Sequence, residues 1–98
     1  MIISLLLALA TPTLHVSGDG GTATLRPTAG RPAVTVNGNY RVTATGARGS
    51  DDVTLKIEQR VKGRWMVLQT QSVTPADIGG GFTTTTEDGG TVSILIAD

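Results

Sequence analysis

Short runs in which apolar and polar residues alternate dominate the chain from residue 13 onward. In the clearest run, residues 53–58, Val53, Leu55 and Ile57 alternate with Thr54, Lys56 and Glu58. Because side chains along a strand alternate between its two sides, such a run predicts a strand with one buried face. Comparable runs cover residues 13–16, 22–26, 33–36, 39–44, 65–73, 82–86 and 91–97.

Clusters of Gly, Pro, Asn and Asp separate these runs and predict turns. No segment keeps a helical period over ten residues, so no long helix is predicted. About eight short strands divided by turn signals are typical of an all-β, antiparallel β-sandwich of jelly-roll or immunoglobulin-like type. We therefore predict a single sandwich domain at residues 13–98, preceded by an apolar strand or arm at residues 1–12.

The Asn37-Gly38 pair lies between two alternating runs and is the strongest short hairpin signal in the chain. It predicts a two-residue turn in which both residues have positive φ. In this interpretation one face is shared by four apolar residues: Val34, Val36, Tyr40 and Val42.

A second hairpin is expected around Lys62-Gly63. A three-residue turn places Trp65 and Val67 on the inward face, whereas a two-residue turn places Met66 and Leu68 there. We favour the three-residue turn, because Gly suits its left-handed position and because it buries the only Trp of the chain. Trp65 is therefore predicted to lie largely buried between two sheets.

The first ten residues, MIISLLLALA, are apolar on both sides of a strand. They resemble the apolar part of a secretory signal peptide with Ala8-Leu9-Ala10 as its cleavage site, but no Lys or Arg precedes them. A membrane-spanning helix would need about 20 apolar residues. We favour a strand or arm covered on both sides, partly by another chain, through six residues: Ile2, Ile3, Leu5, Leu6, Leu7 and Leu9.

Composition adds limits on the partners. The chain has 98 residues, no Cys and three aromatic residues, so its core is thin and no disulfide supports it. Oligomerisation often supplies the missing burial, and a homo-oligomer is therefore expected. Eight basic and eight acidic residues give no net charge, which argues against nucleic acid as the main partner.

The residue types that carry chemistry are sparse. His15 is the only histidine and no Cys or carboxylate cluster accompanies it, so no metal site is predicted. The Asp-Gly-Gly turns at residues 19–21 and 88–90 lack the repeated acids that calcium needs, and no Lys follows the glycines at 79–81 to make a phosphate loop. The Thr run at 83–86 is interpreted as a strand former rather than a sugar-contacting face. We expect no enzyme activity, no catalytic residue and no cofactor.

One hairpin tip is basic. Arg60, Lys62 and Arg64 cluster there, with Trp65 beside them. Such a tip can contact an acidic partner, although it is more often a solvated turn whose Arg stems cover an aromatic ring. We name these three basic residues as interface candidates.

Residues 38–73 contain three segments in series. A strand ending in Gly-x-Tyr corresponds to Gly38-Asn39-Tyr40, a second strand contains Val53-Thr54-Leu55 and Gln59, and a short turn ends in Gly63-Arg64-Trp65. This series resembles small structural proteins of tailed bacteriophages, in which the turn often carries Asp-Gly where this chain has Lys62-Gly63. The resemblance covers about a third of the chain. It implies a β-sandwich on a virion, such as a capsid decoration (cement) protein or a head-fibre base, without catalytic residues.

Two hypotheses follow. The first is a non-enzymatic virion protein that stabilises a capsid shell by binding other capsid subunits, with no membrane and no nucleic acid as partner. The alternative is a secreted bacterial adhesion or carbohydrate-binding module, with residues 1–10 as its signal peptide. The scarcity of aromatic residues, on which sugars usually stack, counts against the alternative. The mass of the isolated protein separates the two, because only the alternative removes residues 1–10.

Overall fold

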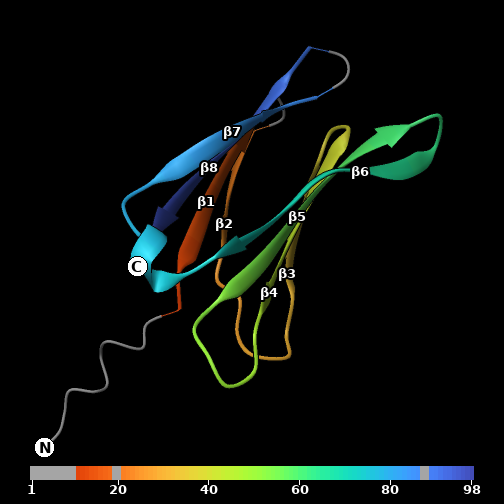
Figure 1. Ribbon diagram of the computed structural model, residues 1–98. Coiled ribbons are helices and arrows are strands. Elements are labelled where there is room, and N and C mark those ends of the chain that lie inside the picture. The colour runs from red at the N-terminus through yellow and green to blue at the C-terminus, as the bar shows by residue number, and fades with distance from the viewer. Residues whose placement is uncertain (1–10, 19–20, 87–88) are drawn as a thin grey trace, which may run out of the picture.

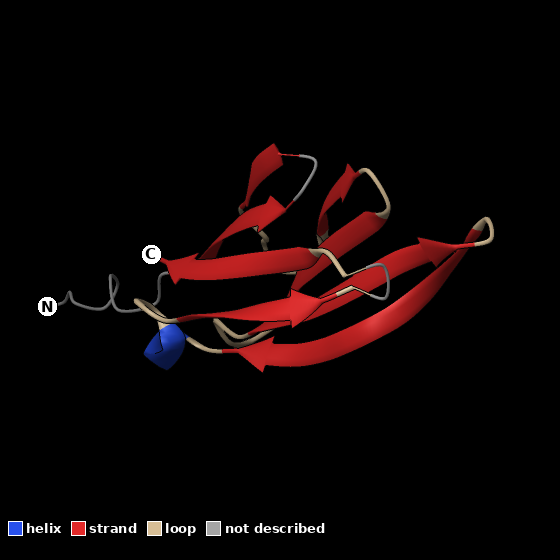
Figure 2. Cartoon of the chain, turned by 90° about the horizontal axis from the view of Figure 1, so that it is seen from above, coloured by secondary structure: helices blue, strands red, loops and turns tan. Residues whose placement is uncertain are grey.

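The computed structural model describes residues 11–18, 21–86 and 89–98 and contains two four-stranded antiparallel sheets (Figures 1 and 2). The sheets have the strand orders β2-β1-β8-β7 and β3-β4-β5-β6. The elements are β1 (Thr13–Gly18), β2 (Gly21–Leu25), β3 (Ala33–Asn37), β4 (Tyr40–Gly46), β5 (Val53–Val61), β6 (Arg64–Val73), the short 3₁₀ helix η1 (Pro75–Asp77), β7 (Gly81–Thr85) and β8 (Thr91–Ala97). The predicted all-β sandwich is confirmed.

The connectivity is simple. Strands β3 to β6 follow one another as a meander within one sheet. The other sheet joins the first and last hairpins, because β1 pairs with β8 from Thr13↔Ala97 to Gly18↔Val92. This consecutive order contains fewer crossovers than the Greek-key connections of immunoglobulin or jelly-roll sandwiches. It also makes the β2-β1-β8-β7 sheet a surface assembled from both ends of the sequence.

The inward faces of the two sheets form one apolar core. Burial follows the alternation predicted from the sequence, since Val53, Leu55 and Ile57 are buried and intervening residues of β5 face outward. The buried apolar residues are Leu14, Val16, Leu25, Tyr40, Val42, Ala44, Val53, Leu55, Ile57, Val73, Val92, Ile94 and Ile96.

A hydrogen bond from β7 to Gln69 of β6 connects the two sheets, and a second bond within β6 holds the Gln69 side chain. The Thr84 hydroxyl donates to Gln69 Oε1, and Gln69 Nε2 donates to Gln71 Oε1 at 2.7 Å. Between these strands, η1 begins with a capping box in which Thr74 and Asp77 bond reciprocally to each other's backbone. This side of the sandwich is therefore held by hydrogen bonds in addition to apolar packing.

The first hairpin turn lies one residue later in the chain than predicted. Asn37 pairs with Tyr40, so the turn residues are Gly38 and Asn39, and of these only Gly38 has positive φ, at 63°. Gly at the first central position suits a type II′ turn, in which the second central residue keeps negative φ. The expectation of positive φ at Asn37 is therefore wrong.

The face predicted for two valines of β3 is also wrong. Directly opposed residues share a face, and a two-residue turn pairs even-numbered residues of β3 with odd-numbered residues of β4. Val34 and Val36 therefore lie outside, 51% and 53% exposed, whereas Tyr40 and Val42 are buried.

The expectation that Trp65 is buried between the sheets is wrong as well. Arg64 pairs with Val61, so the turn is the two-residue Lys62-Gly63, with φ values of 52° and 78°. Lys62 accepts the left-handed conformation that a type I′ turn requires, and a loop shorter by one residue reverses the faces of the returning strand. Trp65 consequently lies outside and is half-buried.

A β-bulge in β6 then changes which of its residues face the core. Ile57 pairs with Gln69 and Glu58 with Val67, which leaves Leu68 as the extra residue. Beyond the bulge the odd-numbered residues point inward, and Val73 is fully buried. The same strand therefore offers Trp65 and Val67 to the outside near its start and supplies the core near its end.

Candidate functional site

The outer side of the β3-β4-β5-β6 sheet, here called the β3–β6 face, exposes apolar side chains on its two edge strands. Val36 pairs with Arg41, Arg41 with Glu58, and Glu58 with Val67, so these four side chains form one row across the sheet. Five large apolar side chains of the described residues are exposed, and three of them lie on this face: Val34, Val36 and Val67. Val67 and Trp65 are neighbours on the outward side of β6 and form a small apolar patch, whereas Val34 and Val36 lie on β3, across the charged residues Arg41 and Glu58.

An ion pair occupies the centre of this row. Arg41 donates from Nε to Glu58 Oε1 at 2.8 Å and from Nη2 to Glu58 Oε2 at 3.0 Å, a bidentate arrangement. The hydrogen bonds from Arg41 lower the pKa of Glu58, against the opposing effect of desolvation, and the charges of Arg41 and Lys56 lower it further. Glu58 is only 5% exposed although its strand position faces outward. The carboxylate is therefore ionised at neutral pH and fixed in place.

Trp65 lies against this ion pair. The guanidinium carbon of Arg41 is 4.5 Å from the centroid of the indole ring, and that of Arg60 is 5.0 Å from it. Both distances are in the range of cation–π interactions. Since Arg41 is also held by Glu58, the side chains of three neighbouring strands fix the orientation of one half-exposed aromatic ring.

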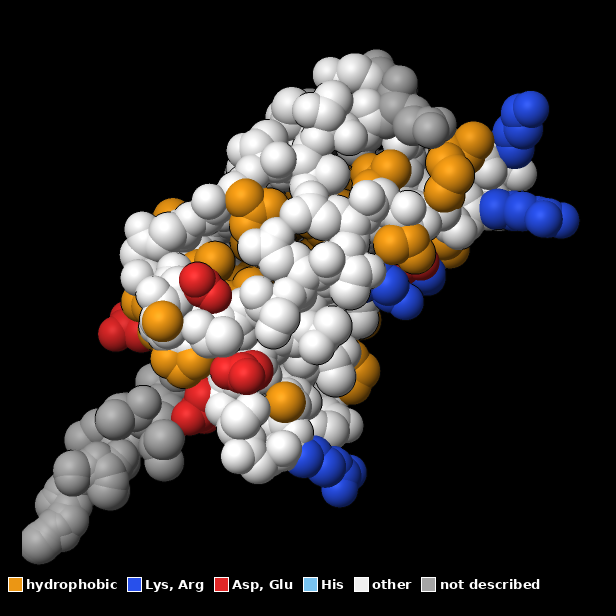
Figure 3. Space-filling view, viewed as in Figure 1, with side chains coloured by type: hydrophobic (Ala, Val, Ile, Leu, Met, Phe, Trp, Pro, Cys, Tyr) orange, Lys and Arg blue, Asp and Glu red, His pale blue; other side chains and the backbone are white. Residues whose placement is uncertain are grey.

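The basic interface candidates lie together. Arg60, Lys62 and Arg64 are exposed at the end of the β5–β6 hairpin, where Lys and Arg side chains extend from one end of the molecule (Figure 3). The contact of Arg60 with the Trp65 ring agrees with the commoner interpretation of this tip, a solvated turn whose Arg side chains cover an aromatic ring. The apolar candidates of the N-terminal segment, Ile2, Ile3, Leu5, Leu6, Leu7 and Leu9, lie outside the described residues.

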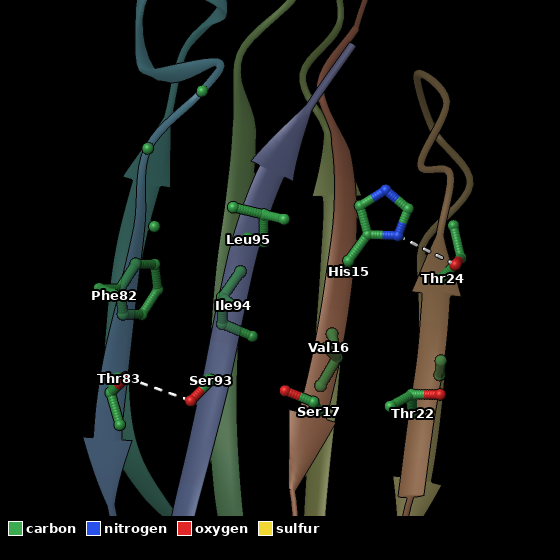
Figure 4. Close-up of a pocket in the computed structure, with 14 residues that line it drawn as sticks. His15, Val16, Ser17, Thr22, Thr24, Phe82, Thr83, Ser93, Ile94 and Leu95 are labelled. Carbon is green, nitrogen blue, oxygen red and sulfur yellow. Dashed lines mark hydrogen bonds between the residues drawn. The ribbon is translucent and has the colours of Figure 1, made fainter.

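A second surface was missed from the sequence. The outer side of the β2-β1-β8-β7 sheet contains a groove of about 690 Å³ (Figure 4). Its side chains include His15, Ser17, Thr22, Thr24, Thr83, Ser93 and Leu95. The alternation of Thr22 and Thr24 with apolar residues indicated that β2 has a polar side. Nothing in the sequence indicated that β1 and β8 would be neighbours.

The described residues do not assemble the groups of the common hydrolytic or metal sites. His15 Nδ1 lies 3.2 Å from Thr24 Oγ1 rather than beside a carboxylate. Within residues 11–18, 21–86 and 89–98, no three His, Cys, Asp or Glu side chains are grouped so that they could hold a metal ion, and no helix has the length and apolar character to cross a membrane. Comparison of the chain with protein-family models, with curated proteins and with solved structures gives no match.

Proposed function

We propose that this chain is a non-enzymatic structural protein that docks onto other protein subunits through its β3–β6 face. The observation that carries the proposal is the patch formed by Val67 and Trp65, whose ring orientation is fixed by Arg41 and Arg60. Trp and Arg are the residue types most enriched at binding hot spots, and a pre-ordered side chain loses less entropy on binding. The basic tip beside the patch adds electrostatic steering toward an acidic partner surface.

The resemblance to small phage proteins indicates where this docking would take place. We propose a virion, with the chain as a capsid decoration or cement protein that stabilises the shell by binding other capsid subunits. Such a role requires contact area and no chemistry, in agreement with the apolar patch. A homo-oligomer and an N-terminal arm buried in a neighbouring subunit, through Ile2 to Leu9, belong to the same proposal.

Binding to assembled shells tests the proposal. The probe is an empty shell made from the major capsid protein that the same genome encodes, and binding is measured by co-sedimentation. Val67→Lys places a charge in the patch, whereas Leu95→Lys is a matched control on the opposite side of the sandwich, because the two native side chains are 52% and 54% exposed. We expect Val67→Lys to weaken binding by about tenfold or more, as at an interface hot spot, and Leu95→Lys to leave it unchanged.

Two results would overturn the proposal: no binding of the native chain to the shells, or equal loss for both variants. The alternative hypothesis, a secreted adhesion or carbohydrate-binding module, is separated by the intact mass of the protein purified from its source. A mass that lacks residues 1–10 favours secretion, and a mass that retains them favours the virion.

A further inference from the structure

We propose that the groove on the outer side of the β2-β1-β8-β7 sheet binds a neutral oligosaccharide. This site is independent of the β3–β6 face, since the core separates the two surfaces. The inference rests on the arrangement of the groove's side chains, on their lack of charge and on the exposed apolar side chain of Leu95.

The first observation is a row of four hydroxyl groups. Thr22 pairs with Ser17, Ser17 with Ser93, and Ser93 with Thr83, so the row crosses all four strands of the sheet (Figure 4). Neighbouring strands are about 4.8 Å apart, so successive hydroxyl groups are spaced by nearly the length of one sugar ring in an extended glycan. A glycan lying across the strands can therefore meet one hydroxyl per sugar residue.

Part of this row is available for hydrogen bonding. Thr83 and Ser93 bond to each other at 3.2 Å. The hydroxyl groups of Ser17 and Thr22 have no hydrogen-bond partner among the described residues. Each can donate one hydrogen bond and accept others, as sugar hydroxyls do, so the two sets of groups are chemically matched.

The second observation is the absence of charge. None of the side chains that line the groove, as far as the structure describes the chain, is Asp, Glu, Lys or Arg. A polyanionic glycan would meet no counter-charge there, and its desolvation would be uncompensated. The groove therefore favours a neutral ligand over a uronate or sulfated one, in contrast to the basic hairpin tip at the end of the other sheet.

The third observation concerns the second row, in which Thr24, His15, Leu95 and Gly81 pair across the same four strands. Leu95 is 54% exposed and offers apolar surface to the carbon–hydrogen side of a sugar ring. Beside it, Gly81 lies so close to β8 that a Cβ there would collide with the carbonyl oxygen of Ile94. Phe82, the next residue of β7, is paired with buried Ile94 and packs against the core. Leu95 therefore gives the groove one exposed apolar side chain next to its hydroxyl groups, a combination that suits a sugar ring.

Titration followed by backbone amide NMR tests the proposal. The probes are four neutral hexasaccharides (cellohexaose, maltohexaose, chitohexaose and mannohexaose) and the anionic hexagalacturonate. We expect at least one neutral probe to shift the amides of β1, β8 and β7 with a dissociation constant in the millimolar range, typical of a shallow site, and hexagalacturonate to shift none of them.

Substitutions of groove residues test whether the probes bind in the groove. The double variant Ser17→Ala, Thr22→Val and the single variant Leu95→Lys are each expected to weaken binding about tenfold or more, because they remove the unengaged hydroxyls or the apolar contact. Val67→Lys, on the other sheet, is expected to bind as the native chain does. All these positions are at the surface, and unchanged circular dichroism spectra check the fold.

The proposal is overturned if no neutral probe shifts the groove amides, if hexagalacturonate binds there as well as the neutral probes, or if Val67→Lys alone abolishes binding. The sugar-binding proposal and the docking proposal can fail independently of each other. Shell binding fails with Val67→Lys and sugar binding fails with Leu95→Lys, so either can be lost while the other is retained.

Discussion

Single residues on the outer side of the β3–β6 sheet depart most from what the alternation indicates. Glu58 was expected to face solvent, and its position does face outward, yet neighbouring side chains cover it. The bidentate contact with Arg41 joins residues 17 apart in sequence, and it depends on the register between β4 and β5. A hydrophobicity pattern carries no information about that register, so the sequence could predict the face of Glu58 but not its partner.

The ion pair makes stability depend on pH. The pKa of Glu58 is lower in the folded chain than in the unfolded chain, where it is about 4.3. Ionised Glu58 therefore contributes stability above that pH, and the contribution is lost as the pH falls through the lower folded value. We expect the urea midpoint of the native chain to decrease between about pH 5 and pH 3, and Glu58→Gln to reduce this decrease. Equal pH dependence in the two proteins would contradict the prediction.

At the level of the elements, all eight strands could be predicted, because a period of two with turn residues between runs is a strong local signal. The faces of β3 and of the start of β6 were predicted wrongly. The side of β6 that holds Trp65 depends on one residue of loop length at Lys62-Gly63, and the inward position of Val73 depends on the bulge at Leu68. The groove was missed for a related reason, since the pairing of β1 with β8 joins the two ends of the chain.

The turn at Lys62-Gly63 offers a direct test of the type I′ assignment. Lys62 is the only described non-glycine residue with positive φ, a conformation that costs an ordinary side chain about 1 kcal/mol and that Asn tolerates better. We expect Lys62→Asn to raise the free energy of unfolding by about 0.5–1 kcal/mol. Gly63→Ala, at a φ of 78°, is expected to lower it. Chemical denaturation measures both, and a destabilised Lys62→Asn variant would contradict the assignment.

For the whole molecule, thirteen buried apolar residues between positions 14 and 96 form one core cluster among the described residues. We expect a chain that begins at Thr11 to fold with an unchanged unfolding midpoint, whereas its binding to capsid shells is expected to weaken. Circular dichroism and co-sedimentation measure the two properties. An unfolded truncated chain would show that residues 1–10 contribute a core strand, and unchanged shell binding would show that they are not an interface.

The two outer faces of the sandwich lie on opposite sides of a core about 10 Å thick. A copy that attaches to a surface through its β3–β6 face therefore turns its hydroxyl row away from that surface. Many copies on one shell would present these rows as a repeating array, in which each sugar contact is weak but several form at once. Multivalent attachment of this kind can exceed the single-site affinity by about 10²–10⁴ without any new contact, so a millimolar groove could hold a whole particle on a glycan-coated surface.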